Sequence, residues 1–288
     1  MHRYQLSYES INTYSEPVSG AFYKFLIYPF LSYNLQITRT DFKVSINGDW
    51  WESRLSDQQT TALFFKAAEK FKRIEFLFEG ELTMEDVILP MITPLENEQE
   101  LLLDKEWMTE NYSYLFSDPR RKSYLPSSIY IPFEWNHQLS LWENVRALGE
   151  WIHEYIEFQA GITDTSTEAQ EVLSVKKGVC QDFVHLFLGI IRNHQIPARY
   201  VSGYLFAGGN DQVRGNLQLH AWVEVNLPGQ GWIGLDPTNN LLIDHHYVKV
   251  CHGYDYDDCM PVAGVIQSAA QKQKTEYEVK IQALAQNQ

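Results

Sequence analysis

The stretch Gly178-Val179-Cys180-Gln181-Asp182-Phe183 opens the segment that decides the fold. Apolar residues then recur at the spacing of a helix: Phe183, Leu186, Phe187, Ile190 and Ile191. Positions i, i+3, i+4, i+7 and i+8 share one face of an α-helix. The segment therefore predicts a buried helix with Cys180 at or just before its first turn.

A cysteine at the start of a helix has chemical consequences. The N–H groups of the first turn have no partners inside the helix, and the helix dipole is positive there, so negative charge is favoured. A thiol ionises more readily in such a place than a free thiol does. Gly178 has no side chain, and we expect it to let the backbone turn sharply and a substrate approach Cys180.

After this helix the apolar residues repeat with a period of two. Residues 198–205 are rich in β-branched and aromatic side chains, and from Leu217 to Val225 the odd-numbered positions are apolar. The turn-forming segment 228–231 follows, and residues 232–236 return along the sheet. Helices that precede antiparallel strands indicate the α+β class, with the helix that carries Cys180 packed on an antiparallel sheet.

Residues 1–110 have the pattern of a β-sandwich. Apolar and polar residues alternate from Tyr4 to Tyr8, and a second alternating run ends at Asn47-Gly48, a dipeptide typical of hairpins. Residues 71–78 form a further apolar, aromatic run, whereas the alanine- and lysine-bearing residues 58–70 favour a short helix. No cluster of reactive side chains stands out here, so we expect a structural or recognition domain.

Residues 111–138 are predicted to be a linker, because three prolines interrupt a segment rich in serine, tyrosine and arginine. Residues 139–288 then form the second domain. The segments Ser140-Leu-Trp-Glu143 and Thr165-Ser-Thr-Glu168 fit capping boxes and predict two helix starts. Residues 276–281 alternate again and predict a last strand, which we assign to this second domain.

Length and charge narrow the class of protein. A chain of 288 residues is long enough for about two domains. Its net charge of −14 disfavours nucleic acid as a partner, because an acidic protein repels phosphate backbones.

Cysteine count and hydropathy suggest the compartment. Three cysteines in a chain of this size do not suggest a disulfide framework. Neither a signal-peptide pattern at the N-terminus nor an apolar run long enough for a membrane span is visible. We therefore expect a cytoplasmic protein that does not enter a membrane.

His220 and Asp236, which both follow Cys180 in the sequence, can complete a reactive group. Because the odd-numbered apolar residues of the 217–225 strand face the core, His220 points to the other face, and Asp236 on the return strand shares that face. If the start of the helix docks there, thiol, imidazole and carboxylate form a relay. His220 lies about three residues farther from the turn than Asp236, so we expect strand twist or a bulge to close the offset.

Each member of such a relay has a defined role. The Cys180 thiolate is the nucleophile, because the neutral thiol reacts weakly. The His220 imidazole removes the thiol proton and later protonates the leaving group. The Asp236 carboxylate fixes the tautomer and orientation of the imidazole. The N–H of Cys180 can stabilise the oxyanion that develops on the substrate.

Taken singly, none of the three residues is diagnostic. A single cysteine is more often a small buried hydrophobe than a nucleophile, and a histidine on a strand is more often a satisfied core residue. An aspartate before proline often only starts a turn. The combination of a cysteine at a helix start, a histidine on an amphipathic strand and an aspartate one hairpin later favours a nucleophile.

The chain from about Leu139 to Gly264 resembles the transglutaminase-like superfamily of bacterial predicted cysteine proteases. The segments that carry the resemblance, in order, are Thr167-Glu-Ala-Gln-Glu-Val-Leu173, Gly178-Val-Cys-Gln-Asp-Phe183, Ile196-Pro-Ala-Arg-Tyr-Val-Ser-Gly-Tyr204, His220-Ala-Trp-Val-Glu224 and Gly231-Trp-Ile-Gly-Leu-Asp-Pro-Thr238. The resemblance implies a papain-like core behind an N-terminal β-sandwich. It implies Cys180 as nucleophile, His220 as base and Asp236 as orienting acid, and no cofactor.

Three further residues lie near this predicted site. Tyr204 and Trp222 are candidates to line a substrate groove, although aromatic core packing explains both equally well. His185 lies five residues after Cys180, on a different face of the helix, and we expect it to pack in the core or lie on the surface.

The remaining histidines and cysteines do not predict a metal site. His245, His246 and His252 lie near Cys251 and Cys259, but neither a Cys-x-x-Cys nor a His-Glu-x-x-His spacing is present. We therefore expect no metal, and Cys251 and Cys259 to be non-catalytic.

Three functions fit these features. The preferred one is a peptidase or amidase that hydrolyses a peptide or protein substrate through a thioester acyl-enzyme. The second is a crosslinking enzyme that passes the same acyl group to a lysine amine. The third is a non-catalytic scaffold that retains the core for its shape. The sequence does not predict an oligomeric state.

Overall fold

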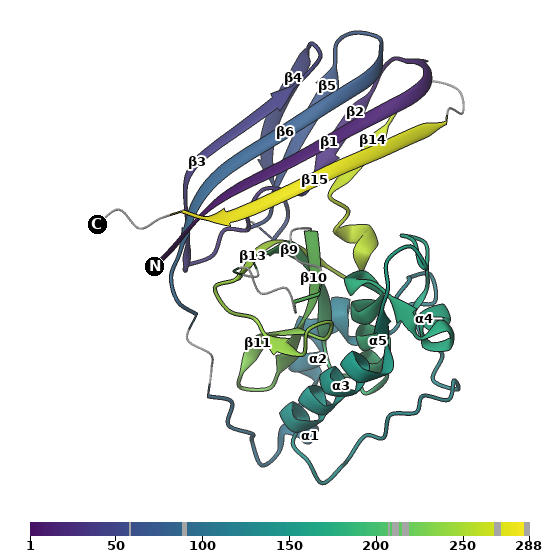
Figure 1. The fold of residues 1–288 in the computed structure, drawn as a ribbon. Coiled ribbons are helices and arrows are strands. Elements are labelled where there is room, and N and C mark those ends of the chain that lie inside the picture. The colour runs from purple at the N-terminus through teal and green to yellow at the C-terminus, as the bar shows by residue number, and fades with distance from the viewer. Residues whose placement is uncertain are drawn as a thin grey trace.

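The computed structural model describes residues 1–57, 59–87, 91–206, 208, 213–214, 219–267 and 272–284. Two parts are visible in Figure 1, a β-sandwich and, below it, a mixed domain of helices and antiparallel strands, which we call the α+β domain. The predicted class, a β-sandwich followed by an α+β core with a helix on an antiparallel sheet, is confirmed.

The sandwich consists of two four-stranded sheets in the described part of the chain, ordered β15-β1-β6-β3 and β14-β2-β5-β4. Their strands are β1 (His2–Val18), β2 (Phe22–Phe25), β3 (Leu35–Val44), β4 (Gly48–Arg54), β5 (Thr61–Ala67), β6 (Phe71–Met84), β14 (Val262–Val265) and β15 (Gln273–Ala283). Rings from the two sheets meet in the core, where Phe25 and Phe76 lie 4.5 Å apart. Such aromatic burial is the main source of stability in a two-sheet domain.

The last strand lies in a different place from the one predicted. The alternating residues 276–281 do form a strand, but β15 pairs antiparallel with β1 over residues Tyr4 to Tyr14 and so belongs to the sandwich. β14 likewise pairs with β2. Each strand satisfies an otherwise open edge of a sandwich sheet. The α+β domain is therefore inserted between β6 and β14.

Two local predictions for the sandwich were wrong. Residues 61–67 form strand β5 rather than a helix, because β5 pairs with β2 and β4 on either side and buries side chains on both faces. Asn47-Gly48 does not close a hairpin, because β3 and β4 lie in different sheets. A type I′ turn needs positive φ at both residues, and neither residue adopts it.

The α+β domain contains an antiparallel sheet ordered β12-β11-β10-β9-β13. Its elements are α1 (Glu98–Leu101), α2 (Lys105–Leu115), α3 (Leu141–Tyr155), β7 (Glu157–Phe158), α4 (Ala169–Val175), β8 (Lys177–Gly178), α5 (Cys180–Asn193), β9 (Ala198–Leu205), β10 (Leu219–Leu227), β11 (Gly231–Asp236), β12 (Leu241–Leu242), β13 (Tyr247–Gly253) and the 3₁₀ turn η1 (Tyr256–Asp258). None of the described helices is long and apolar enough to cross a membrane.

The two predicted capping boxes differ in outcome. Ser140 caps α3 as predicted, since its hydroxyl accepts from the N–H of Glu143 at 3.2 Å and the Glu143 carboxylate accepts from the N–H of Ser140 at 2.8 Å. The second box does not form, because α4 begins only at Ala169, and the Thr167 hydroxyl instead accepts from the N–H of Asp164 at 3.0 Å. The predicted start, at Leu217, of the strand that carries His220 lies outside the described residues.

Residues 111–138, predicted to be a linker, instead pack against the α+β domain and bury side chains in its core. Helix α2 continues to Leu115, which is fully buried. The following irregular segment packs on α5, where Leu125 is also fully buried and lies so close to Gly189 that a side chain there would clash. The prolines exclude regular structure, but the segment still contributes to the core.

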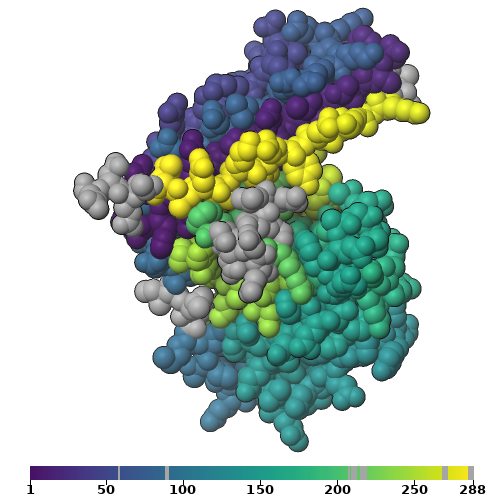
Figure 2. Space-filling model, in the orientation of Figure 1, coloured from purple at the N-terminus to yellow at the C-terminus, as the bar shows by residue number. Residues whose placement is uncertain are grey.

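The sandwich and the α+β domain contact each other directly. The Tyr204 hydroxyl on β9 donates to the carbonyl of Ile27 at 2.6 Å, and the N–H of Phe30 donates to the carbonyl of Lys249 at 2.8 Å. In Figure 2 the yellow C-terminal strand runs along the sandwich just above the green and teal α+β domain.

Candidate active site

Cys180 is the first residue of α5 and is partly exposed. The start of this helix is held by Asp182, whose carboxylate accepts from the N–H of Val179 at 2.7 Å and from the hydroxyl of Thr163 at 2.6 Å. These bonds fix the backbone on both sides of the thiol. Cys180 thus lies where first-turn N–H groups and the helix dipole favour an anion.

Gly178 has a different role from the predicted one. Its φ is not positive, so no sharp left-handed turn is made there. A Cβ at this position would instead lie 2.4 Å from the carboxylate of Asp182. The absence of a side chain therefore leaves room for the carboxylate that caps the helix.

His220 and Asp236 are brought together by neighbouring strands. His220 Nε2 lies 2.8 Å from Asp236 Oδ2, and both side chains are fully buried. The register pairs Val223 with Leu235 without any shift along β10 and β11. Asp236 is therefore a diagonal neighbour of His220, within reach across adjacent strands, and the predicted twist or bulge is not needed.

The body of helix α5 packs on the core-facing side of β10, and the start of the helix approaches His220. Ala221, Val223 and Val225 of β10 share one core cluster with the apolar residues of α5, whereas Trp222 belongs to a separate cluster. Helix α5 therefore covers the odd-numbered face of the strand. His220 is the second residue of β10, and there its ring lies close enough to Cys180 for the thiol to help raise the pKa of the imidazole.

The charges around His220 favour its protonated form. Burial disfavours the imidazolium, but the Asp236 carboxylate and then Cys180 outweigh that effect and raise the pKa of His220 above its usual value. For Asp236 burial likewise opposes the charged form, and His220 is the main group that lowers its pKa. Asp236 engages Nε2, whereas the buried Nδ1 has no hydrogen-bond partner among the described residues.

Asp236 is oriented by residues that the sequence analysis missed. The N–H of Thr238 donates to Oδ1 at 2.9 Å, the amide of Asn239 donates to Oδ2 at 2.7 Å, and the Tyr247 hydroxyl donates to Oδ2 at 2.9 Å. Thr238 and Asn239 follow the aspartate closely enough for an Asx-type turn to be expected. No local pattern points to Tyr247, which reaches the carboxylate only because β13 lies in the same sheet.

The Tyr247 hydroxyl remains a donor under ordinary conditions. Burial and then the Asp236 carboxylate raise the pKa of Tyr247 far above its usual value. An aspartate that accepts several hydrogen bonds is held in one orientation and stays ionised. Tyr247 is therefore a positioning residue for the Asp236–His220 pair.

Tyr204 and Trp222 do not lie on an open groove. Tyr204 is completely buried, and its hydroxyl bonds to the sandwich at Ile27. Trp222 is only 1% exposed and packs edge-on against Tyr247 with ring centroids 5.5 Å apart. Both side chains thus support the sheet behind the site, in keeping with the core-packing alternative.

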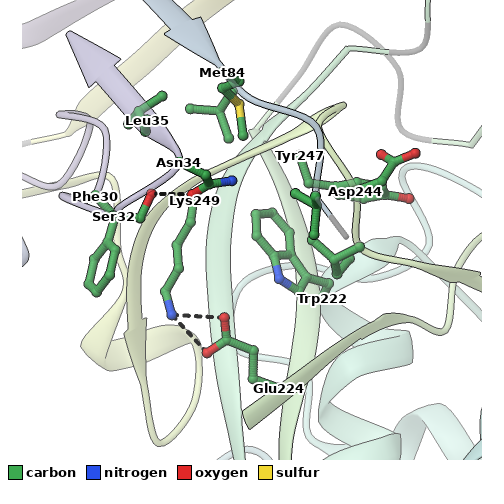
Figure 3. A pocket seen from close by; sticks show the side chains of 13 residues that line it. Phe30, Ser32, Asn34, Leu35, Met84, Trp222, Glu224, Asp244, Tyr247 and Lys249 are labelled. Carbon is green, nitrogen blue, oxygen red and sulfur yellow. Dashed lines mark hydrogen bonds and ion pairs between the residues drawn. The ribbon is translucent and has the colours of Figure 1, made fainter. Parts of the chain in front are cut away.

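A cavity of about 200 Å³ lies between Trp222 and the sandwich. Figure 3 shows Leu35 and Met84 of the sandwich facing Trp222 and the ion pair of Glu224 with Lys249. Lys249 Nζ lies 2.7 Å from Glu224 Oε2.

The same carboxylate binds a second cation. Arg199 Nε donates to Glu224 Oε2 at 2.6 Å from the directly opposite position on β9. Burial opposes the charged carboxylate, but Lys249 and then Arg199 lower the pKa of Glu224 to about 2. The pKa of Lys249 is also lowered, because its own burial outweighs Glu224. The ion pair therefore depends on both cations being held against one carboxylate.

The remaining two cysteines and His185 are buried in the core. Cys251 and Cys259 are buried and contact each other, and burial raises the pKa of Cys259 well above its usual value. His185 is fully buried, accepts from the N–H of Tyr256 at 3.3 Å, and has a pKa lowered to about 3 by burial. A neutral core histidine is what the sequence analysis allowed for that position.

Comparison with known proteins finds similarity in the α+β domain. Residues 134–237 match the family model of the transglutaminase-like superfamily. An uncharacterised protein of Mycobacterium tuberculosis is 37% identical over 146 residues, which cover 48% of this chain and 46% of that protein. The chain thus matches less than half the length of this relative.

Two further matches extend the comparison. A protein-glutamine gamma-glutamyltransferase of Pseudomonas aeruginosa is 37% identical over 73 residues, which cover 23% of this chain and 11% of that protein. A crystal structure of a protein provisionally named a cysteine protease, from Cytophaga hutchinsonii, superimposes with a TM-score of 0.68 at 17% identity and covers 99% of this chain and 92% of that chain. At this identity the likeness shows a shared fold that includes both the sandwich and the α+β domain.

Proposed function

Because residues 134–237 match the family model of the transglutaminase-like superfamily, we propose that the protein is a thiol-dependent acyl-transfer enzyme with Cys180, His220 and Asp236 as its catalytic residues. One observation carries the proposal: a fully buried imidazole that bonds a carboxylate through one nitrogen and faces a partly exposed thiol at a helix start. A purely structural histidine would not need both neighbours.

The first half of the reaction forms a thioester. The Cys180 sulfur attacks an amide carbonyl, and the proton that His220 has taken from the thiol passes to the departing amine as the C–N bond breaks. Negative charge that develops on the carbonyl oxygen is stabilised by the N–H of Cys180 at the start of α5. Asp236 stabilises the imidazolium throughout, because it stays ionised beside it.

The second half regenerates the thiol. Water attacks the thioester carbonyl while His220 accepts a proton from the water, the C–S bond breaks, and the sulfur recovers its proton from His220. The products are a carboxylic acid and an amine or ammonia. The net reaction is hydrolysis of a peptide or side-chain amide, and its substrate is a peptide or protein.

Transfer to an amine is a second candidate function. The Pseudomonas aeruginosa relative is named a protein-glutamine gamma-glutamyltransferase, and its matched region covers 23% of this chain. In that case a lysine amine replaces water in the second half of the reaction. We prefer hydrolysis, because it needs no separate site for the amine.

A glutamine peptide offers a direct test. Ammonia release and peptide cleavage are measured with wild-type protein and with the Cys180→Ala variant, with and without an added primary amine. Turnover that disappears in the variant supports the thiol mechanism, and amine incorporation that outpaces hydrolysis would favour the transferase. Failure of excess iodoacetamide to label Cys180 near neutral pH would instead favour a non-catalytic scaffold.

The place of action stays a prediction. The sequence pattern predicts a cytoplasmic protein, in which an unpaired thiol persists. Cell fractionation with an antibody to the native protein tests this, and recovery in the periplasmic or secreted fraction would contradict it.

A further inference from the structure

Three imidazoles and two carboxylates gather where the sandwich meets the α+β domain. His2 opens β1, Asp86 follows β6, and Asp244, His245 and His246 precede β13. They come from three segments that are remote in the sequence. No spacing motif connects them, which is why the sequence analysis predicted no metal.

The distances within this cluster suit a metal ion. His2 Nε2 lies 2.7 Å from Asp86 Oδ1, and His245 Nδ1 lies 3.8 Å from the same oxygen. Two ligands bound to tetrahedral zinc, each about 2.0–2.1 Å from the ion, lie roughly 3.3 Å apart, between these two values. We infer that His2, Asp86 and His245 form a binding site for a divalent transition-metal ion of the zinc type.

The two histidines also support each other beside the carboxylate. The rings of His2 and His245 stack with centroids 3.7 Å apart at 12°, so that each is held beside the carboxylate.

The donor set points to zinc rather than to calcium or magnesium. Imidazole nitrogen is a good ligand for zinc, copper and nickel, whereas calcium and magnesium prefer oxygen. Two imidazoles and a carboxylate leave one position of a tetrahedral site for water. The adjacent His246 is engaged by Asp244, whose Oδ1 lies 3.0 Å from His246 Nδ1, so we assign this pair to the surroundings of the site.

The backbone that carries His245 is fixed from both domains. The Tyr4 hydroxyl of β1 donates to the carbonyl of His245 at 3.3 Å. The N–H of Phe206 donates to the carbonyl of His246 at 2.9 Å, and the N–H of Tyr247 donates to the carbonyl of Asp244 at 3.1 Å. A ligand on a backbone held in this way loses little freedom on binding an ion.

An ion at this site would join the two domains. Two of its ligands belong to the sandwich, and the third lies two residues before Tyr247, which orients Asp236. Metal binding would therefore add a cross-domain link next to the segment that leads to the candidate active site. This part of the inference does not depend on the proposed acyl-transfer activity.

Zinc binding is tested by titration of the full chain, without a histidine tag, in a Cys180→Ala background that removes the exposed thiol as a ligand. We expect one zinc ion per chain with a Kd of about 1 µM or tighter, and a melting temperature that rises with zinc concentration. His2→Gln, Asp86→Asn and His245→Gln should each weaken binding at least about tenfold. The exposed His137→Gln is the matched control and should bind like the parent.

Other outcomes overturn the assignment. No zinc uptake at 100 µM, or equal affinity in the parent and in His2→Gln, shows that these residues make only a hydrogen-bonded, stacked cluster. A loss confined to His246→Gln places the ion on Asp244, His245 and His246 instead. If a variant fails to fold, zinc-edge X-ray absorption of the parent decides: nitrogen and oxygen ligands are expected, and sulfur ligands refute the site.

Discussion

Replacing Asp236 by asparagine removes one charge from the candidate site and leaves its shape nearly unchanged. The carboxylate is fully buried, and it is the neighbour that does most to raise the pKa of His220. Without it, burial opposes the charged ring and only Cys180 remains to favour it, so we expect the neutral imidazole to dominate. The asparagine amide can also donate to Nε2, which would place the ring proton on Nδ1, the nitrogen that must accept the thiol proton.

The size of the effect follows from the charge that is lost. Two unit charges about 4 Å apart interact by roughly 4 kcal/mol at an effective dielectric constant of 20. If this stabilisation of the imidazolium is present in the transition state and absent from the variant, the rate falls about a thousandfold, at about 1.4 kcal/mol for each factor of ten. We therefore expect kcat/KM to fall by about three orders of magnitude, with most of the loss in kcat.

The assay has two parts. Ammonia release or peptide cleavage gives kcat and KM, and the rate of Cys180 alkylation by iodoacetamide gives a readout that needs no substrate. Asp118→Asn is the matched control. It also removes one carboxylate, but this carboxylate pairs with Arg120 and lies far along the chain from Asp236. The control should change neither rate by more than about twofold.

Stability against pH gives an independent check. A histidine with a raised pKa stabilises the fold fully when the pH is below its ordinary pKa, and this stabilisation is lost as the pH rises through the pKa of the folded state. An aspartate with a lowered pKa stabilises the fold when the pH is above its ordinary pKa, and this stabilisation is lost as the pH falls through the pKa of the folded state. The stability difference between wild type and Asp236→Asn should therefore be largest between about pH 4 and 6.5 and shrink in strong acid and strong base.

The reasoning is refuted by one clear result. If Asp236→Asn folds with wild-type stability and alkylates and turns over substrate within threefold of wild type, the carboxylate does not act through His220. The buried bond between them would then be structural only.

Three further predictions follow from the same structure. Tyr247→Phe should lower kcat about tenfold with KM unchanged, because it removes one hydrogen bond to a buried carboxylate, and steady-state kinetics checks this; an unchanged kcat would exclude a positioning role. Glu224→Gln leaves Lys249, whose side chain is 16% exposed, without its carboxylate partner. The unfolding free energy should fall by about 3 kcal/mol in urea titrations at pH 7, a loss that Lys249→Met should partly restore. The pKa of Glu224 is lowered to about 2, so its carboxylate stabilises the fold when the pH is above the ordinary pKa of glutamate, and this stabilisation is lost as the pH falls toward 2. The destabilisation by Glu224→Gln should therefore fade in acid. A difference in stability that does not change with pH would contradict the ion-pair argument. Mass spectrometry of the native protein after brief iodoacetamide treatment should find the label on Cys180 alone, and equal labelling of buried Cys251 would show that the fold opens readily.

Part of the site could be predicted from local patterns alone. Helical spacing placed Cys180 at the start of a helix, and period-two alternation placed His220 on a strand whose odd-numbered residues face the core. Both are short-range signals, because they depend only on neighbouring residues. The structure adds that His220 and Asp236 are diagonal partners, which depends on the register of two strands.

Residues that reach the site from strands distant in the sequence could not be predicted from local patterns. Tyr247 approaches Asp236 from β13, and Arg199 meets Glu224 only because β9 pairs with β10 in one particular register. A shift of one residue would turn each side chain to the other face. Alternation identifies a strand but does not name its partner, and for this reason β15 was predicted as a strand and assigned to the wrong domain.

The closing of the sandwich by β14 and β15 has a consequence for synthesis on the ribosome. The first six strands emerge early, yet β1 and β2 each keep an unpaired edge until residues 262–283 have been made. In the interval a nascent chain exposes ready templates for intermolecular pairing. The α+β domain is synthesised after β6 and before β14. We therefore expect chaperones to be needed more by the incomplete six-stranded sandwich than by the domain that carries Cys180.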